Sequence, residues 1–312
     1  MIAGKGFGHT LEGMPLQIVR ALYGLQSTGK AFRNYLASNM REMGYVSSKA
    51  DPDLWSMKPD TKSDGTEYYR NIICYVDDVA VTMEDPKEFM DTLSLQFTFK
   101  EGGVQEPELY LGANVKKWYI AESDNPGKMR WALASTKYTK RAIADLEVEL
   151  NWIEKRLSTK VTTPLASRYR PELDQSAKLN PERQNYFHGL ISVLRWICVH
   201  GRLNILMPVS MLSRYLVSAQ VDHLNQAFQS FAFLKRYETS TMVFDDTEPE
   251  FHERRFKEYD WSECYPNAKE SLSLDMPQQM GKTVVMSCFV DADYAGCRGT
   301  RRSHTGVLIF VN

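Results

Sequence analysis

Apolar residues recur at every fourth position between residues 30 and 45, and this spacing predicts an amphipathic helix. Phe32, Leu36 and Met40 form its apolar stripe, and Gly44 is placed to end it. Similar rows predict further helices at Tyr138–Arg156, Val209–Leu216 and Asn225–Tyr237. Two more helices are predicted to begin at a proline that follows a capping residue, at Pro86 after Asp85 and at Pro181 after Asn180.

Shorter apolar runs that are bounded by turn residues predict strands. Tyr68–Tyr75 and Val79–Met83 are two such runs, and the acids of the sequence YVDD lie between them. Together they predict a β-hairpin with Asp77 and Asp78 at its tip. Further strands are predicted at Glu108–Lys116, Thr283–Val290 and Thr305–Val311, with residues 291–303 as a loop.

The chain has 312 residues, of which 43% are hydrophobic and 25% charged, as is typical of a globular protein. This length predicts two domains, and one large domain or three small ones would also fit it. The five cysteines form no CxxC pair, which predicts buried free thiols in a reducing compartment. Neither a membrane-spanning run nor a signal-peptide core is found, so we expect a cytoplasmic or nuclear protein that is not secreted and has no membrane partner.

Basic residues are concentrated in Ser135–Arg170, although the formal net charge of the chain is −1. This stretch has eight lysines and arginines against four acids, with Tyr138, Trp152 and Tyr169 among them. Such a pattern can follow a nucleic-acid backbone, and it can also be the solvated face of a helix. Residues 245–263 have the opposite balance, with eight acids against three bases, and they predict a linker.

Two adjacent carboxylates between apolar strands repel each other unless a cation lies beside them. Mg²⁺ is bound by carboxylate oxygens together with substrate phosphates. Two such ions, about 4 Å apart, can activate a 3′-hydroxyl and stabilise the leaving pyrophosphate. Asp77 and Asp78 therefore suit nucleotidyl transfer. The alternative is a polar turn, in which aspartate is common.

Six segments resemble, in the same order, motifs of the reverse transcriptase of copia-type LTR retrotransposons. IVRALYGLQSTGKAFRNYL resembles the family's LYGLKQAPRxWY segment, and IICYVDDVAV resembles the motif with two catalytic aspartates. FKEGGVQEPELYLGANV is similar to the primer-gripping strand. YFHGLISVLRWICVHGRLNI and SFAFLKRYETSTMVFD resemble the thumb and connection, and FVDADYAGCRGTRRSHTGVLIFV resembles the start of RNase H. The alternative, an unrelated globular protein, would require all six of these ordered similarities to be coincidences.

The resemblance implies an α+β fold, with a partial palm and thumb, a helical connection and the first β-hairpin of an RNase H-like domain. The implied division is a partial palm at 1–120, thumb and connection at 121–244, an acidic linker at 245–282 and a truncated RNase H-like start at 283–312. The implied partners are an RNA or DNA template-primer, deoxynucleotides and the remainder of a Gag-Pol-type polyprotein. The implied locations are a cytoplasmic virus-like particle or the nucleus.

The resemblance also implies roles for single positions. Asp77 and Asp78 would bind the catalytic Mg²⁺ or Mn²⁺ ions. Asp291 would be the first RNase H carboxylate, with Asp293 the weaker choice. The positions implied to hold substrates are Gly24, Leu25, Gln26 and Lys100 for nucleotide and template, and Tyr110, Leu111 and Gly112 for the primer grip.

Parts of both implied active sites have no counterpart in this sequence. The polymerase needs a third carboxylate upstream of LYGL, but no aspartate precedes Asp51, and Glu12 is the only acid before that segment. An RNase H site needs several carboxylates, but only Asp291 and Asp293 follow residue 282. The segment LYGLQSTGK also departs from LYGLKQAPR. We therefore expect Met1 to be an internal methionine of a longer polyprotein. The alternative is an inactive remnant that at most binds nucleic acid.

Overall fold

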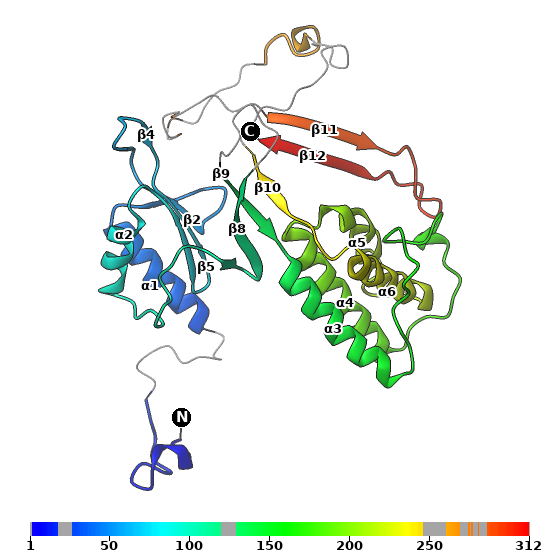
Figure 1. The fold of residues 1–312 in the computed structure, drawn as a ribbon, viewed down its shortest axis with the longest axis horizontal. Helices are drawn as coiled ribbons and strands as arrows, with labels where there is room; N and C mark the ends of the chain where they lie inside the picture. Colours follow the sequence, from blue (N-terminus) through cyan, green and yellow to red (C-terminus); the bar gives the residue numbers. More distant parts are fainter. Residues whose placement is uncertain are drawn as a thin grey trace. The chain divides into compact units, whose positions relative to one another are not determined.

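The fold is described from a computed structural model of the chain. The described residues are 2–17, 27–119, 129–245, 260–268 and 286–311, with the single residues Leu274, Met276 and Met280. The chain divides into two compact units, Met1–Glu106 with Lys269–Lys282, and Pro107–Ala268 with Thr283–Asn312. Both units combine α-helices with antiparallel sheets, which confirms the α+β class (Figure 1). The finer division into palm, thumb, connection and RNase H segments stays a prediction. No described helix is long and apolar enough to cross a membrane.

The first unit is built on a four-stranded antiparallel sheet in the order β1-β2-β5-β6. A separate ribbon of β3 and β4 surrounds a turn at Asp64–Gly65, where Gly65 has a φ of 84°. The elements are α1 (Thr28–Glu42), β1 (Val46–Ser47), β2 (Leu54–Ser56), β3 (Asp60–Thr61), β4 (Glu67–Tyr68), β5 (Asn71–Tyr75), β6 (Asp78–Thr82), α2 (Pro86–Ser94) and the 3-10 turn η1 (Lys5–Phe7).

Buried side chains from α1, β2, β5 and α2 form the core of the first unit. Leu36 and Met40 of the predicted stripe lie in it, and Phe32 packs at its edge. Gly44 follows α1 with a φ of 89°, and its N–H donates to the carbonyl of Arg41 at 2.9 Å. The predicted helix and its glycine stop are therefore confirmed, because a left-handed residue at this place satisfies the last carbonyls of a helix.

The second unit combines a four-stranded antiparallel sheet, in the order β10-β9-β8-β7, with four α-helices in its described part. The predicted helices are confirmed within a few residues, whereas β9 and β10 were not predicted. The elements of this part are β7 (Leu109–Tyr110), β8 (Ala113–Tyr119), β9 (Met129–Ala134), α3 (Thr136–Trp152), η2 (Pro171–Leu173), α4 (Pro181–Val199), η3 (Leu203–Ile205), α5 (Leu206–Ser213), α6 (Val221–Arg236), β10 (Met242–Phe244) and η5 (Trp261–Glu263).

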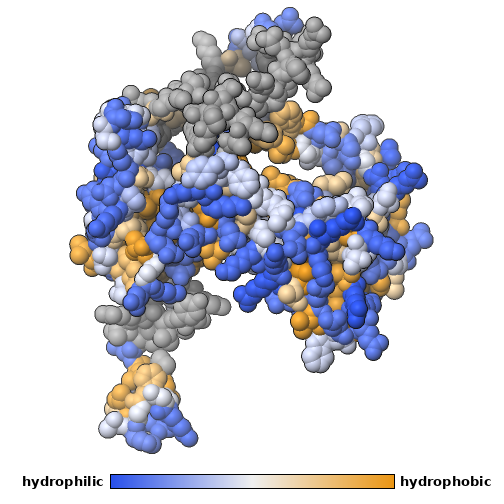
Figure 2. Space-filling view, in the orientation of Figure 1, coloured by the Kyte–Doolittle hydropathy of each residue, from blue (hydrophilic) through white to orange (hydrophobic). Residues whose placement is uncertain are grey.

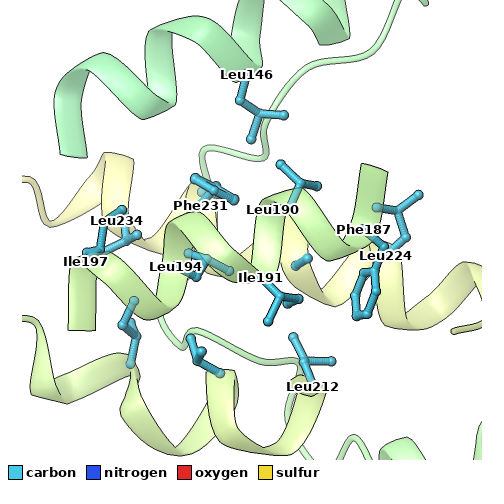
Figure 3. Close-up of a cluster of buried hydrophobic side chains, with 14 of the residues drawn as sticks. Leu146, Phe187, Leu190, Ile191, Leu194, Ile197, Leu212, Leu224, Phe231 and Leu234 are labelled. Atoms are coloured by element: carbon cyan, nitrogen blue, oxygen red, sulfur yellow. The ribbon is translucent and has the colours of Figure 1, made fainter. Parts of the chain in front are cut away.

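The four helices of the second unit enclose one apolar core. Leu146 of α3, Leu194 of α4, Leu212 of α5 and Phe231 of α6 point into it from different sides (Figure 3). Each of these side chains is at most 2% exposed. The visible outer surface over α3 is mostly hydrophilic (Figure 2). This division of apolar and polar faces is what stabilises a packed helix in water.

The last two strands form a separate antiparallel ribbon, β11 (Met286–Ala292) with β12 (Thr305–Val311). Its two faces are both apolar and exposed, with Val290 and Val307 on one face and Phe289 and Leu308 on the other. Asp291 pairs with Gly306 inside the ribbon. The prediction that Asp291 lies in a loop is therefore wrong, because backbone pairing continues two residues beyond the apolar run.

All five cysteines are free thiols, as predicted. Cys74, Cys198 and Cys297 are buried, whereas Cys264 and Cys288 are exposed. The expectation that all five are buried is wrong for those two residues. Cys288 belongs to β11, in which six of the seven residues are exposed.

Candidate functional site

The YVDD sequence forms the tip of a tight hairpin. Strands β5 and β6 pair as far as Tyr75 and Asp78, so only Val76 and Asp77 make the turn. The predicted hairpin is confirmed, with one correction. Asp78 is the first residue of β6 rather than part of the turn, because it completes the ladder opposite Tyr75.

Val76 has a φ of 55°, which is rare for a β-branched side chain. Two-residue hairpin turns favour positive φ at their first position, because that conformation matches the twist of the strands. Glycine or asparagine normally occupies such a position. The conformation of Val76 therefore costs about 1–3 kcal/mol. Backbone strain of this kind is concentrated at ligand-binding and catalytic sites.

The hairpin has one face toward the core and one face away from it. Ile72 and Cys74 of β5 are buried, whereas Ile73 and Tyr75 are more than 40% exposed. Residues directly opposite each other on paired strands share a face. Asp78 therefore lies on the open face with Tyr75, beside the turn that carries Asp77.

Both carboxylates are exposed and keep their hydration. Among the described residues, no hydrogen bond or ion pair to either side chain is found. No cluster of three or more metal-binding side chains occurs in the described parts of the chain. Asp77 and Asp78 are thus adjacent hard-oxygen donors on an open face, an incomplete ligand set that suits a divalent cation already bound to phosphates.

The other implied polymerase positions are only partly described. Gly24, Leu25 and Gln26 lie outside the described residues. Lys100 is exposed in the loop after α2, where its carbonyl accepts a hydrogen bond from the N–H of Gly103 at 2.8 Å. In the described part of the first unit, no hydrogen bond or ion pair joins Lys100 to the aspartate pair, so its role stays a prediction.

The implied primer-grip residues lie at the tip of a second tight hairpin. Tyr110 pairs with Ala113, and the turn consists of Leu111 and Gly112, with φ of 52° and 84°. Both values are positive, as in the type I′ turns that connect twisted strands. The single strand predicted at Glu108–Lys116 is therefore wrong, because this turn divides it into β7 and β8. The role of the three residues stays a prediction.

The two carboxylates of the implied RNase H segment differ in their surroundings. Asp293 accepts hydrogen bonds from the backbone N–H and the ring Nδ1 of His304, the latter at 3.1 Å. The backbone hydrogen bond from His304 holds the pKa of Asp293 below its usual value. Asp291 is exposed on β11, and no partner for its side chain is found among the described residues. This difference agrees with the choice of Asp291, which stays a prediction.

Two basic residues of the stretch Ser135–Arg170 form ion pairs within the second unit. Lys140 lies 3.1 Å from Glu238, and Arg141 lies 3.9 Å from Asp145 on the same helix face. These ion pairs favour the solvated-helix interpretation for α3. The remaining basic residues of the stretch are exposed: Lys137, Lys155, Arg156, Lys160, Arg168 and Arg170. Nucleic-acid binding by them stays a prediction.

Comparison with known proteins supports the coarser part of the family resemblance. The chain is 24% identical to the retrovirus-related Pol polyprotein from transposon RE1 of Arabidopsis thaliana over 295 residues, which cover 94% of this chain and 16% of that protein. It is 25% identical to the corresponding polyprotein from transposon RE2 over 209 residues, or 66% of this chain and 12% of that protein. No family profile and no solved structure matches the chain. The chain, which spans less than a fifth of either relative, is thus similar to part of a retrotransposon Pol polyprotein.

Proposed function

We propose that the chain is part of the reverse transcriptase of a copia-type retrotransposon Pol polyprotein. The observation that carries this proposal is the β5–β6 tip, where Asp77 and Asp78 are exposed beside the strained Val76. This arrangement does not stabilise the fold, because the two carboxylates repel each other and the turn is strained. A bound divalent cation offsets the repulsion.

Bound Mg²⁺ would supply activation of the primer 3′-hydroxyl and stabilisation of the leaving pyrophosphate. Asp77 and Asp78 would hold the ions from the protein side, and the substrate phosphates would complete the ligands. Tyr75 lies opposite Asp78 on the open face, so its ring would border a nucleotide whose phosphates share the ions. The short turn limits the movement of both carboxylates.

A protein made of these 312 residues alone is expected not to extend a primer, because no upstream aspartate is present in the sequence to act as a third ligand. The same chain joined to an upstream reading frame that encodes such an aspartate is expected to be active. In this second protein, Asp77→Asn or Asp78→Asn should reduce templated synthesis below detection.

The experiment is a primer-extension assay with Mg²⁺ and with Mn²⁺. Asp91→Asn is the matched control, because Asp91 is an exposed acid on α2 of the same unit. Synthesis that persists in both Asp77→Asn and Asp78→Asn would rule out the proposed role of the pair. Synthesis by the 312 residues alone that is lost in Asp77→Asn would show that no upstream aspartate is needed.

Metal binding can be tested on the 312-residue protein itself. Mn²⁺ added with a nucleotide and template-primer should broaden the NMR signals of residues 71–82, and Asp78→Asn should remove most of this effect. Equal broadening in the variant would place the ion elsewhere.

A further inference from the structure

A groove lies between helices α4 and α5, outside the sites described above. It is a cavity of about 440 Å³, and residues spaced by three or four positions on each helix line it. Figure 3 shows α5 running back along α4, with Leu212 near Ile191 rather than near Ile197. We call this cavity the α4–α5 groove. Its lining includes Arg195 and Val199 of α4, Leu203 of the connection, and Leu206, Ser210 and Ser213 of α5.

The wall of the groove is apolar but open. Val199, Leu203 and Leu206 are each at least 50% exposed, and Met207 beside Leu206 is 68% exposed. Exposed aliphatic side chains that adjoin one another mark contact surfaces on soluble proteins. Two helices that lie side by side leave a groove into which the side chains of a third helix fit. Because α5 has eight residues, the groove has room for about two turns of such a helix.

Positive charge surrounds the groove. Residues 183–221, which contain most of α4 and all of α5, include four arginines and no aspartate or glutamate. Arg195 is exposed, and among the described residues no ion pair or hydrogen bond to its side chain is found. Cys198 also lines the groove, and burial raises the pKa of its thiol to about 11, so this group is neutral. An acidic ligand therefore meets an available cation and no carboxylate from this stretch of the sequence.

The apolar and charged parts occupy different ends of the groove. The aliphatic residues lie near the connection between the helices, whereas Arg195 is one turn earlier on α4 and Ser213 ends α5. Serine is small, so it leaves room for a carboxylate beside the guanidinium. A nucleic-acid backbone does not match this arrangement, because it needs several cations in a row and its phosphates are not stabilised by an aliphatic wall. A helix with aliphatic residues on one face and an acid one turn away does match it.

We propose that the α4–α5 groove binds an acidic amphipathic helix of a partner protein. Aliphatic side chains of that helix would pack on Val199, Leu203 and Leu206, and a glutamate or aspartate would pair with Arg195. Burial of the aliphatic wall supplies the affinity, and the ion pair selects the charge of the partner. The groove uses neither metal ions nor the aspartate pair, so the outcome of primer extension does not affect this inference.

The experiment measures fluorescence anisotropy of a labelled helical peptide with the 312-residue protein. The peptide is alanine-based, has about 18 residues, and carries leucine at positions i, i+3, i+4 and i+7 with glutamates beside this stripe. We expect saturable binding. A peptide with lysine in place of each glutamate should bind at least about tenfold more weakly. A peptide with serine in place of each leucine should not bind.

Two variants of the protein test the two parts of the groove. Val199→Asp places a charge on the aliphatic wall and should weaken binding of the glutamate peptide at least about tenfold. Arg195→Glu should reverse the preference, so that the lysine peptide binds more tightly than the glutamate peptide. Both residues are exposed, so circular dichroism should show an unchanged helix content in each variant.

Val217→Asp and Arg183→Glu are the matched controls, because both residues are exposed in the same unit and neither lines the groove. Both should keep the affinity and preference of the unchanged protein. The proposal is overturned if no peptide binds, if folded Val199→Asp binds normally, or if Arg195→Glu still prefers the glutamate peptide. Displacement of the peptide by a single-stranded oligonucleotide would assign the groove to nucleic acid, and it would overturn the proposal as well.

Discussion

The helical part of the second unit and the β5–β6 tip of the first unit treat polar groups in opposite ways. His223 of α6 is fully buried, and it accepts a hydrogen bond from the Gln220 N–H and donates one to the Pro171 carbonyl. Asp77 and Asp78 are exposed, and among the described residues they have no such partners. The helical part thus satisfies its buried polar group with hydrogen bonds, which stabilises the fold. The tip instead keeps two carboxylates available as ligands, at a cost in backbone strain. Changes in the two regions should therefore have different effects on folding.

The largest effect on folding is expected in the helical core. Leu194 is 0% exposed on α4, so Leu194→Ala removes buried methyl groups and leaves a cavity. The free energy of unfolding should fall by about 2–5 kcal/mol. Urea denaturation followed by circular dichroism measures it. Val217→Ala is the control, because Val217 is 93% exposed in the same unit. An equal loss in both variants would contradict the assignment of this core.

A smaller effect, which depends on pH, is expected at His223. Burial lowers the pKa of its ring, so the folded protein holds it neutral, while the unfolded chain takes up a proton below about pH 6.5. The free energy of unfolding should therefore be highest above this pH and fall as the pH drops below it. Urea midpoints measured across that range test the direction.

Two variants identify the source of that pH dependence. His223→Gln should flatten the decline, whereas His188→Gln should preserve it because His188 is exposed on α4. An unchanged slope in His223→Gln would assign the effect to other groups.

At the tip, glycine is expected to stabilise the hairpin. Val76→Gly removes the penalty of a positive φ and should raise local stability by about 1 kcal/mol. Hydrogen exchange of the β5 and β6 amides measures local opening. Val81→Gly is the contrast, because Val81 pairs with Ile72 inside the ladder, and that change should destabilise the same strands. Faster exchange in Val76→Gly would mean that the turn is not strained.

The smallest effect on stability is expected for the carboxylates themselves. Asp77→Asn and Asp78→Asn should change the free energy of unfolding by less than about 0.5 kcal/mol. By comparison, Asp85→Ala should cost about 1 kcal/mol, because the Asp85 side chain accepts hydrogen bonds from the N–H groups of Lys87 and Glu88 at the start of α2. A large loss in the tip variants, measured by urea denaturation, would indicate that the pair has a structural role.

Features determined by neighbouring residues were predictable from the sequence. Asp85 and Asn180 cap α2 and α4 as expected, since a cap depends on a side chain and the next three residues. The β5–β6 hairpin was predictable for the same reason, because its strands are joined by two residues. The candidate metal ligands followed from the short motif at its tip.

Features that depend on distant pairing were not predictable. Strand β10 pairs Met242 with Leu133 of β9, and neither strand has a periodicity that identifies its partner. Trp131 lies opposite Phe244 only because of this pairing. The turn at Leu111–Gly112 was missed because leucine rarely has a positive φ, so the residues read as one strand.

The β11–β12 ribbon has a practical consequence for handling the protein. Residues 305–311 read TGVLIFV, a window with no charge and no proline, and every residue in it is exposed. Such windows nucleate cross-β aggregates when an edge strand is free to pair with another molecule. Aggregation should therefore increase as the protein concentration rises. The substitution Ile309→Lys places a charge in this window and should delay precipitation without affecting the helical core.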